Sequence, residues 1–282
     1  DAYQDCDRHL VADWGAGLVI PLLHGVVASS AGGFNAITAT GGTTSDYTNS
    51  TDGFQYRSHT FDASGTFTIT ANPDGHVFDV LVVGAGGGRQ AIYNRKSAGG
   101  GGEALTTLGQ TGNVEAYTVT IAAANASDAD DSTFVSAPAT TAALTGRGGI
   151  AGQVSGGNSG NGNAGGSLGS GGGGGGGGGS GGAGNTSANV APYWSQNGAN
   201  GGIGSTNTEF QAGSSTFGGG GGGGSNNGTV FSVYGYGGSG GGGNGGAMGW
   251  YNSGIPCATN GDANTGGGGG GPGDSGGPGC TP

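Results

Sequence analysis

A run of nine consecutive glycines at 171–179 constrains the fold of this chain more than any other feature of its sequence. Glycine makes up 78 of the 282 residues, and further runs occur at 99–102, 218–224, 241–243 and 266–271. Glycine has no side chain to bury and loses more backbone entropy on folding than any other residue. A glycine-rich tract therefore cannot build an ordinary hydrophobic core. It either stays disordered or becomes ordered by pairing backbone with backbone.

The ordered alternative is a bundle of extended helices. A helix of the polyproline II type has three residues per turn, makes no internal hydrogen bonds and directs its N–H and C=O groups outward. Where every residue is glycine, such helices can pack side by side and bond to one another, because no Cβ separates the backbones. The competing interpretation is a flexible low-complexity linker, but linkers usually mix glycine with serine. These runs are nearly pure, so the sequence predicts a polyglycine II bundle over 146–282.

Residues 46–145 carry the sequence signals of β-strands. Apolar and polar residues alternate at least in part at 54–61, 66–70 and 117–121, and 77–83 is typical of a strand buried on both faces. Turn residues separate these segments, and no amphipathic helix is evident beyond residue 50.

The first 45 residues differ in composition from the rest. They include a short apolar stretch at 18–28, which Pro21 and Gly25 interrupt. We interpret 1–45 as an N-terminal attachment segment, or as a source of a strand that joins a neighbour. The predicted fold class is therefore mainly β, with a glycine-rich polyglycine II helix bundle and little α-helix.

The charge balance argues against several classes of partner. The chain has 6 Lys and Arg against 17 Asp and Glu, for a formal net charge of −11. A phosphate backbone or an anionic membrane surface would be repelled, so nucleic acid is not an expected partner. No apolar run reaches the roughly 20 residues that span a bilayer. We expect no membrane span and no cofactor.

The three cysteines allow two interpretations. Cys257 and Cys280 bracket the last glycine run, and a disulfide between them would close that run as a loop in an oxidising compartment. Cys6 would then be left over. The alternative is that all three cysteines are unpaired.

Aromatic residues are concentrated in the spacers between the glycine runs. A rigid lattice with loops at its ends has little core to receive them, so we expect some of them to be exposed, and clustered exposed aromatics mark binding surfaces. The alternative is that they cap the ends of the bundle. The candidate contact residues are Tyr193, Trp194, Phe210, Phe217, Phe231, Tyr234, Tyr236, Trp250 and Tyr251.

Several motifs imitate catalytic or ligand sites. The hexapeptide at 273–278, Gly-Asp-Ser-Gly-Gly-Pro, reproduces the nucleophile signature of chymotrypsin-like proteases around Ser275. A triad also needs a histidine base, and no histidine lies in a segment like that family's histidine motif. The glycines at 84–88 follow a strand as in dinucleotide-binding folds, but Arg89 replaces the third required glycine. We therefore expect no enzymatic activity.

An acidic turn at 127–132 contains Asp128, Asp130 and Asp131, whose carboxylates suit Ca²⁺. The glycine and the distal glutamate of a calcium-binding loop are missing, and no cysteine and histidine cluster has zinc spacing. The turn is interpreted as a solvated loop, and no metal site is expected.

The order of four segments resembles the glycine-rich domain of many bacteriophage tail-fibre and virion surface proteins. These segments are Asp-Gly-Phe-Gln-Tyr-Arg-Ser-His-Thr-Phe at 52–61, Gly-Thr-Phe-Thr-Ile at 65–69, Phe-Asp-Val-Leu-Val-Val-Gly-Ala-Gly-Gly-Gly at 78–88 and Ala-Tyr-Thr-Val-Thr-Ile at 116–121. The part from residue 146 is similar to distal tail-fibre adhesins, whose polyglycine helices stack into a sandwich with variable aromatic loops. This chain differs in having Ala-Ala-Ala-Asn after Ile121, where glycine is usual.

The resemblance implies a non-enzymatic protein at a virion surface or in another extracellular setting. Its implied partners are a host-cell surface receptor or glycan, contacted through the aromatic loops, and other virion or fibre subunits. A second hypothesis is a secreted filament or matrix subunit that self-assembles through its glycine-rich rods, and self-association into a homo-oligomer suits either one. An ice-binding protein would need ordered rows of Thr or Ala, and the spacers are too irregular for that.

Overall fold

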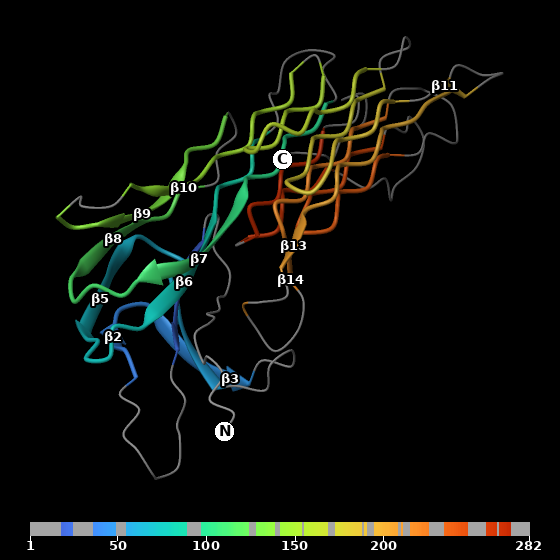
Figure 1. The fold of residues 1–282 in the computed structure, drawn as a ribbon. Coiled ribbons are helices and arrows are strands. Elements are labelled where there is room, and N and C mark those ends of the chain that lie inside the picture. Colours follow the sequence, from blue (N-terminus) through green and yellow to red (C-terminus); the bar gives the residue numbers. More distant parts are fainter. Residues whose placement is uncertain are drawn as a thin grey trace.

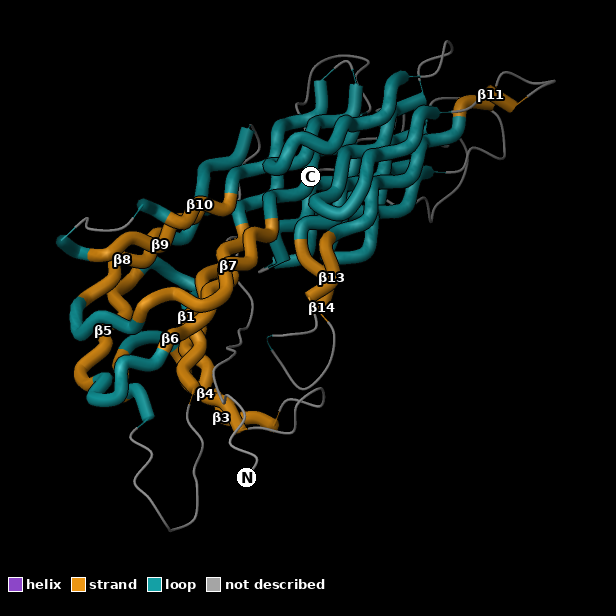
Figure 2. The backbone as a smooth tube through the Cα atoms, viewed as in Figure 1, coloured by secondary structure: helices purple, strands orange, loops and turns teal. Residues whose placement is uncertain are grey.

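The computed structural model consists of a β-sandwich and a glycine-rich lattice that extends from it (Figure 1). The residues that the structure describes are 18–24, 36–48, 55–88, 97–123, 128–138, 142–153, 155–168, 173–187, 189–190, 195–207, 210, 215–225, 234–247, 258–263 and 265–271. Strands occupy the sandwich, and the lattice consists mostly of segments without strand pairing (Figure 2). The described ranges contain no helix, which confirms the prediction of a mainly β protein. It follows that no described helix is long and apolar enough to span a bilayer.

Two five-stranded antiparallel sheets form the sandwich. Their strand orders are β3-β4-β1-β6-β7 and β10-β9-β8-β5-β2. The first sheet contains β1 (Leu18–His24), β3 (Thr43–Thr48), β4 (Gln55–Thr60), β6 (Val77–Val83) and β7 (Ala104–Thr111). The second contains β2 (Thr38–Thr40), β5 (Gly65–Ala71), β8 (Ala116–Thr120), β9 (Ser132–Ser136) and β10 (Leu144–Gly146).

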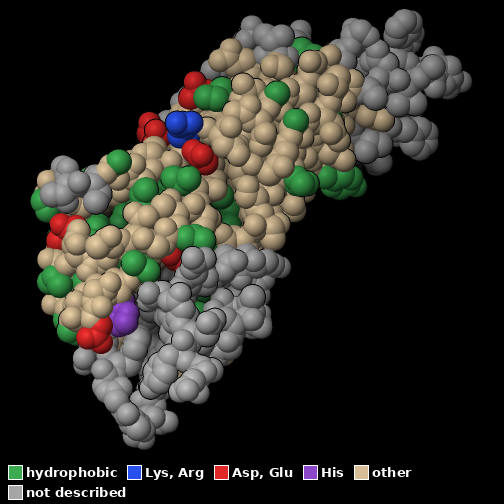
Figure 3. All heavy atoms as spheres, in the orientation of Figure 1, with side chains coloured by type: hydrophobic (Ala, Val, Ile, Leu, Met, Phe, Trp, Pro, Cys, Tyr) green, Lys and Arg blue, Asp and Glu red, His purple; other side chains and the backbone are tan. Residues whose placement is uncertain are grey.

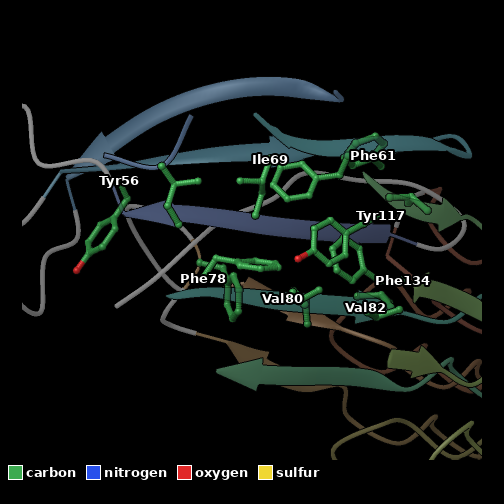
Figure 4. Close-up of a cluster of buried hydrophobic side chains, with 14 of the residues drawn as sticks. Tyr56, Phe61, Ile69, Phe78, Val80, Val82, Tyr117 and Phe134 are labelled. Atoms are coloured by element: carbon green, nitrogen blue, oxygen red, sulfur yellow. The ribbon is translucent and has the colours of Figure 1, made fainter. Parts of the chain in front are cut away.

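The core lies between the two sheets and is rich in aromatic rings (Figure 4). Phe67 on β5 is fully buried, and its ring centroid lies 5.9 Å from that of Phe78, 5.8 Å from that of Tyr117 and 6.1 Å from that of Phe134. Ile69 lies on the same face of β5 and is also buried, as the alternation of its strand predicts. Burial of its phenol raises the pKa of Tyr117 far above the usual range.

Strand β6 is buried on both faces, as its continuous apolar sequence predicts. All residues from Phe78 to Val83 are at most 1% exposed.

The sequence gives no hint of the role of Asp79, a fully buried carboxylate within this strand. It accepts the backbone N–H of Gly109, where the register of β6 and β7 shifts and Gly109 adopts a φ of 69°. The buried carboxylate thus accompanies a β-bulge in the first sheet.

The described part of the first 48 residues contributes three strands to the sandwich. Strand β1 pairs with β4 on one side and with β6 on the other, so part of the expected attachment segment runs through the middle of the first sheet. Strands β2 and β3 belong to opposite sheets, and the residues between them, Gly41 and Gly42, cross from one sheet to the other.

The glycine lattice comprises the described parts of 84–88, 97–103, 147–187, 197–204, 217–225, 234–247 and 258–271. Its segments run side by side and bond to one another through backbone groups (Figure 2). The bonds between two segments recur every third residue. Ala98 donates to Gly175, and Gly101 donates to Gly178 three residues further along both segments.

Three segments occupy the centre of the lattice, and each bonds to six others. We call 99–102, 174–178 and 219–223 the central segments. The segment around 99–102 bonds to 84–88, 147–150, 157–160, 175–178, 217–225 and 266–269. Such packing leaves no room for side chains, since a Cβ on Gly101 would lie under 3.0 Å from the carbonyl oxygen of Gly218.

Outer segments of the lattice carry asparagines that bond across to their neighbours. The Oδ1 atom of Asn200 accepts the backbone N–H of Tyr236 at 2.9 Å. In the same way, Asn244 accepts from Gly237 at 2.9 Å and Asn158 from Gly165 at 3.2 Å. These side chains satisfy backbone donors for which the described residues supply no backbone acceptor.

Candidate functional site: the distal end of the lattice

The lattice has two distinct ends. At the end next to the sandwich, which we call proximal, β6 continues into 84–88, 97–103 leads into β7, and β10 continues into 147–153. Successive lattice segments then alternate in direction, as their hydrogen-bond registers show. Gly238 bonds to Gly220 near the proximal end, and Gly235 bonds to Gly223 nearer the opposite end, which we call distal.

The acidic turn holds the proximal part of the lattice against the sandwich. The Asp131 carboxylate accepts the N–H of Gly148 at 2.8 Å, and the Asp128 carboxylate accepts that of Ala151 at 2.8 Å. The backbone N–H of Ala129 donates to Gly149 at 2.9 Å. Two carboxylates considered as calcium ligands thus bind backbone amides, and the described residues hold no group of three or more His, Cys, Asp or Glu that suits a metal ion.

Phe210 and Phe217 lie at the proximal end, in or beside the hairpin of β13 (Ser205–Asn207) and β14 (Ser215–Phe217). They are only 2% and 4% exposed and belong to the hydrophobic core cluster. The Asn207 side chain donates to the Thr106 hydroxyl of β7 at 2.9 Å. The structure therefore corrects the expectation of surface display for these two residues, because their hairpin lies at the sandwich end.

Tyr234 lies at the distal end, and Tyr236 follows two residues further toward the middle of the lattice. Their ring centroids are 5.3 Å apart with an interplanar angle of 58°, and Tyr236 is 56% exposed. The backbone of Tyr236 accepts the N–H of Gly201 at 2.9 Å and donates to the Asn200 side chain. The tyrosine pair is thus held on a backbone that is fixed on the side of the 197–204 segment, and Tyr236 remains exposed.

The other five candidate aromatics, Tyr193, Trp194, Phe231, Trp250 and Tyr251, lie outside the described residues. The described residues that flank them are all at the distal end. Tyr193 and Trp194 fall between the paired strands β11 (Asn189–Val190) and β12 (Ser195–Gln196), and β11 is labelled far from the sandwich in Figure 1. Phe231 falls between 225 and 234, and Trp250 and Tyr251 fall between 247 and 258.

Cys257, Cys280 and Ser275 also lie outside the described residues, so the disulfide interpretation stays a prediction.

One cavity of about 190 Å³ opens in the sandwich, between β7 and the Phe78, Tyr117 and Phe134 rings. It lies among core residues, away from the distal end.

The visible surface of the lattice is mostly backbone and small polar side chains, with hydrophobic groups scattered singly (Figure 3). Charged groups on that face gather near the junction with the sandwich and over the sandwich itself. The described segments 173–187, 197–204, 217–225 and 234–247 contain no charged residue, so Tyr234 and Tyr236 are set among neutral described segments.

The chain matches no family model, no curated protein and no solved structure.

Proposed function

We propose that the lattice is a bundle of polyglycine II helices. Three observations support this proposal. Bonds between neighbours recur every third residue, the central segments each bond to six others, and a side chain on Gly101 or Gly177 would collide with a neighbouring backbone. A polyglycine II helix directs its backbone groups outward at three residues per turn, which suits bonding to several parallel and antiparallel neighbours at once.

We expect amide hydrogen exchange to reveal the bundle in solution. The amides of the central segments should exchange most slowly within the lattice, because their N–H groups are bonded inside it and open only when it opens. Mass spectrometry or NMR on the intact protein measures this. Exchange of 219–223 at the rate of an unstructured peptide would contradict the proposed bundle.

We propose that the protein is a non-enzymatic surface protein of the tail-fibre type, on a virion, and that it binds a host-cell receptor or glycan through its distal end. The observation that carries this proposal is topological. The segments with Tyr193, Phe231 and Trp250 all connect lattice segments at one end, and the exposed Tyr236 belongs to a lattice segment that begins at that end. The sandwich occupies the opposite end, where attachment to other virion or fibre subunits would leave the distal surface accessible.

The physical argument for recognition is that a rigid lattice holds variable loops in fixed positions. Binding residues are often placed on loops that a rigid scaffold positions, and a fixed scaffold lowers the entropy lost on association. Aromatic side chains are frequent anchors of interfaces, because each buries a large area with few rotatable bonds.

Truncation of the distal aromatics should weaken binding strongly and leave the fold intact. We expect Tyr236→Ala to weaken binding to host cells by about 2 kcal/mol, or roughly thirtyfold in Kd, which is typical of an interface anchor. The double variants of Tyr193 with Trp194 and of Trp250 with Tyr251 should have similar or larger effects. Cell binding and thermal unfolding are measured side by side.

Ile203→Ala is the matched control for this experiment. Ile203 is 59% exposed on the same lattice but lies near its proximal end, so its loss should leave cell binding unchanged. Equal binding by all distal variants and the native protein would refute the receptor-binding proposal.

The alternative is a secreted filament or matrix subunit. One observation favours it, namely that β3 ends the strand order of the first sheet and is composed of polar residues at the sheet edge. An edge strand can pair with a strand of another chain. Distal variants that bind cells normally but no longer assemble into fibres would favour this function over the first.

A further inference from the structure

A buried histidine of the sandwich has a role that the proposed function does not use. The side chain of His59 on β4 is 1% exposed and lies against Phe67, with ring centroids 5.3 Å apart in an edge-on arrangement. Its Nδ1 atom lies 2.7 Å from the carbonyl oxygen of Gly41. A carbonyl only accepts, so Nδ1 carries the proton. The buried Nε2 atom has no hydrogen-bond partner.

Gly41, whose carbonyl oxygen accepts the hydrogen bond from His59, belongs to the crossover between the two sheets. Gly41 and Gly42 have φ angles of 105° and 64°, which favour glycine, and they link β2 of the second sheet to β3 of the first. A Cβ at Gly41 would lie under 3.0 Å from the Thr66 carbonyl oxygen. The crossover is therefore packed tightly against the β4–β5 region, and the imidazole holds it there.

We propose that His59 is an acid-sensitive contact that holds the β2–β3 crossover while its imidazole is neutral and releases it when Nε2 gains a proton. Protonation would place a second N–H and a positive charge in an apolar site that offers Nε2 no acceptor. A buried charge without a partner is costly, so the protonated ring favours states in which it reaches water. Edge strand β3 follows the crossover and would loosen with it.

The charged groups around His59 do not compensate for its protonation. On β3, Asp46 is already paired with Arg57 of β4 through two hydrogen bonds of 2.7 Å. Strands β2 and β5 contain no charged residue, and β1 contains only His24, which pairs with Tyr56 rather than with His59. Burial lowers the pKa of His59, while its bond to Gly41 opposes that change.

The sign of the pH effect follows from linkage. A histidine whose pKa is lower in the folded than in the unfolded state binds fewer protons when folded. Its contribution to stability is complete above the unfolded pKa of about 6.5 and is lost as the pH falls below that value. When one proton is taken up on unfolding, the unfolding equilibrium constant rises about tenfold for each unit by which the pH falls.

The test compares the native protein with His59→Asn between pH 7.5 and pH 5. The asparagine amide can donate to Gly41 from the position of Nδ1 but does not titrate. As the pH falls, the unfolding constants of both proteins are measured. We expect that of the native protein to rise by a factor of up to about ten per pH unit beyond the rise seen for the variant. Equal steepness in the native protein and His59→Asn overturns the proposal.

A second measurement covers the case in which His59→Asn does not fold. NMR titration of the native protein should show that the His59 ring stays neutral below pH 6.5 while the fold persists. Amides of 41–48 should exchange faster as the pH falls, after correction for the intrinsic pH dependence of exchange. Titration of the His59 ring near pH 6.5 with unchanged protection of 41–48 overturns the proposal.

Discussion

Gly101→Ala is expected to disrupt the glycine lattice and to destabilise the protein by about 3 kcal/mol or more, at or beyond the upper end of the usual cost of overpacking. The added Cβ would lie under 3.0 Å from both the carbonyl oxygen and the carbonyl carbon of Gly218. Both atoms belong to a backbone that is itself fixed in the lattice, so neither can move away as the end of a flexible side chain would. Urea or thermal unfolding of the intact protein measures the loss.

Gly182→Ala is the matched control. Gly182 belongs to the same lattice, but a Cβ there would meet only the Ile203 side chain, at 3.3 Å and beyond. Both substitutions lower the backbone entropy of the unfolded chain equally, so this contribution cancels in the comparison. We expect Gly182→Ala to stay close to the native stability. Equal stability of the two variants would show that the central segments are not packed backbone to backbone.

The strands of the sandwich could be predicted because their pattern is local. At 66–70 the alternation places Phe67 and Ile69 on one face, and the structure buries both. The apolar run at 77–83 likewise predicts a strand buried on both faces. The partner of each strand could not be predicted, however. Strand β1 lies between β4 and β6, which come later in the chain, and its own apolar sequence does not specify these neighbours.

The purity of a glycine run is the clearest sequence signal of the lattice. Runs at 99–102, 171–179 and 218–224 contain the central segments, where neighbours on every side exclude a Cβ. Interruptions such as Asn200 and Asn244 lie in outer segments, where a side chain has space and replaces a missing acceptor. The pairing of segments could not be predicted, because glycine has no side chain to distinguish one register from another.

The candidate contact site could be predicted only in part. Sequence reasoning grouped Phe210 and Phe217 with the other spacer aromatics because all of them interrupt glycine runs. A further signal was present, since successive segments of an up-and-down lattice must place their connections at alternate ends. Counting the segments separates the spacer at 205–216, at the proximal end, from those at 188–196, 226–233 and 248–257, whose flanks lie at the distal end.

Phe67→Ala is expected to cost about 3–5 kcal/mol, which is the usual range for the loss of a buried phenylalanine ring. Phe67 is fully buried and contacts the rings of Phe78 on the facing sheet and of Tyr117 and Phe134 on its own sheet. These large aromatic neighbours fix the walls of the cavity, so the site collapses poorly around a methyl group. The measurement is the free energy of unfolding from denaturant titration.

Leu108→Ala provides the control for loss of apolar volume on a strand of the sandwich. Leu108 lies on β7 and is 43% exposed, so its truncation should change stability by less than about 1 kcal/mol.

Hydrogen exchange in Phe67→Ala also tests whether the sandwich and the lattice depend on each other. If the sandwich supports the lattice at its proximal end, Phe67→Ala should make the amides of 99–102 exchange faster as well, because 97–103 continues directly into β7. Unchanged exchange at 99–102 despite the expected loss of stability would mean that the lattice folds independently of the sandwich core.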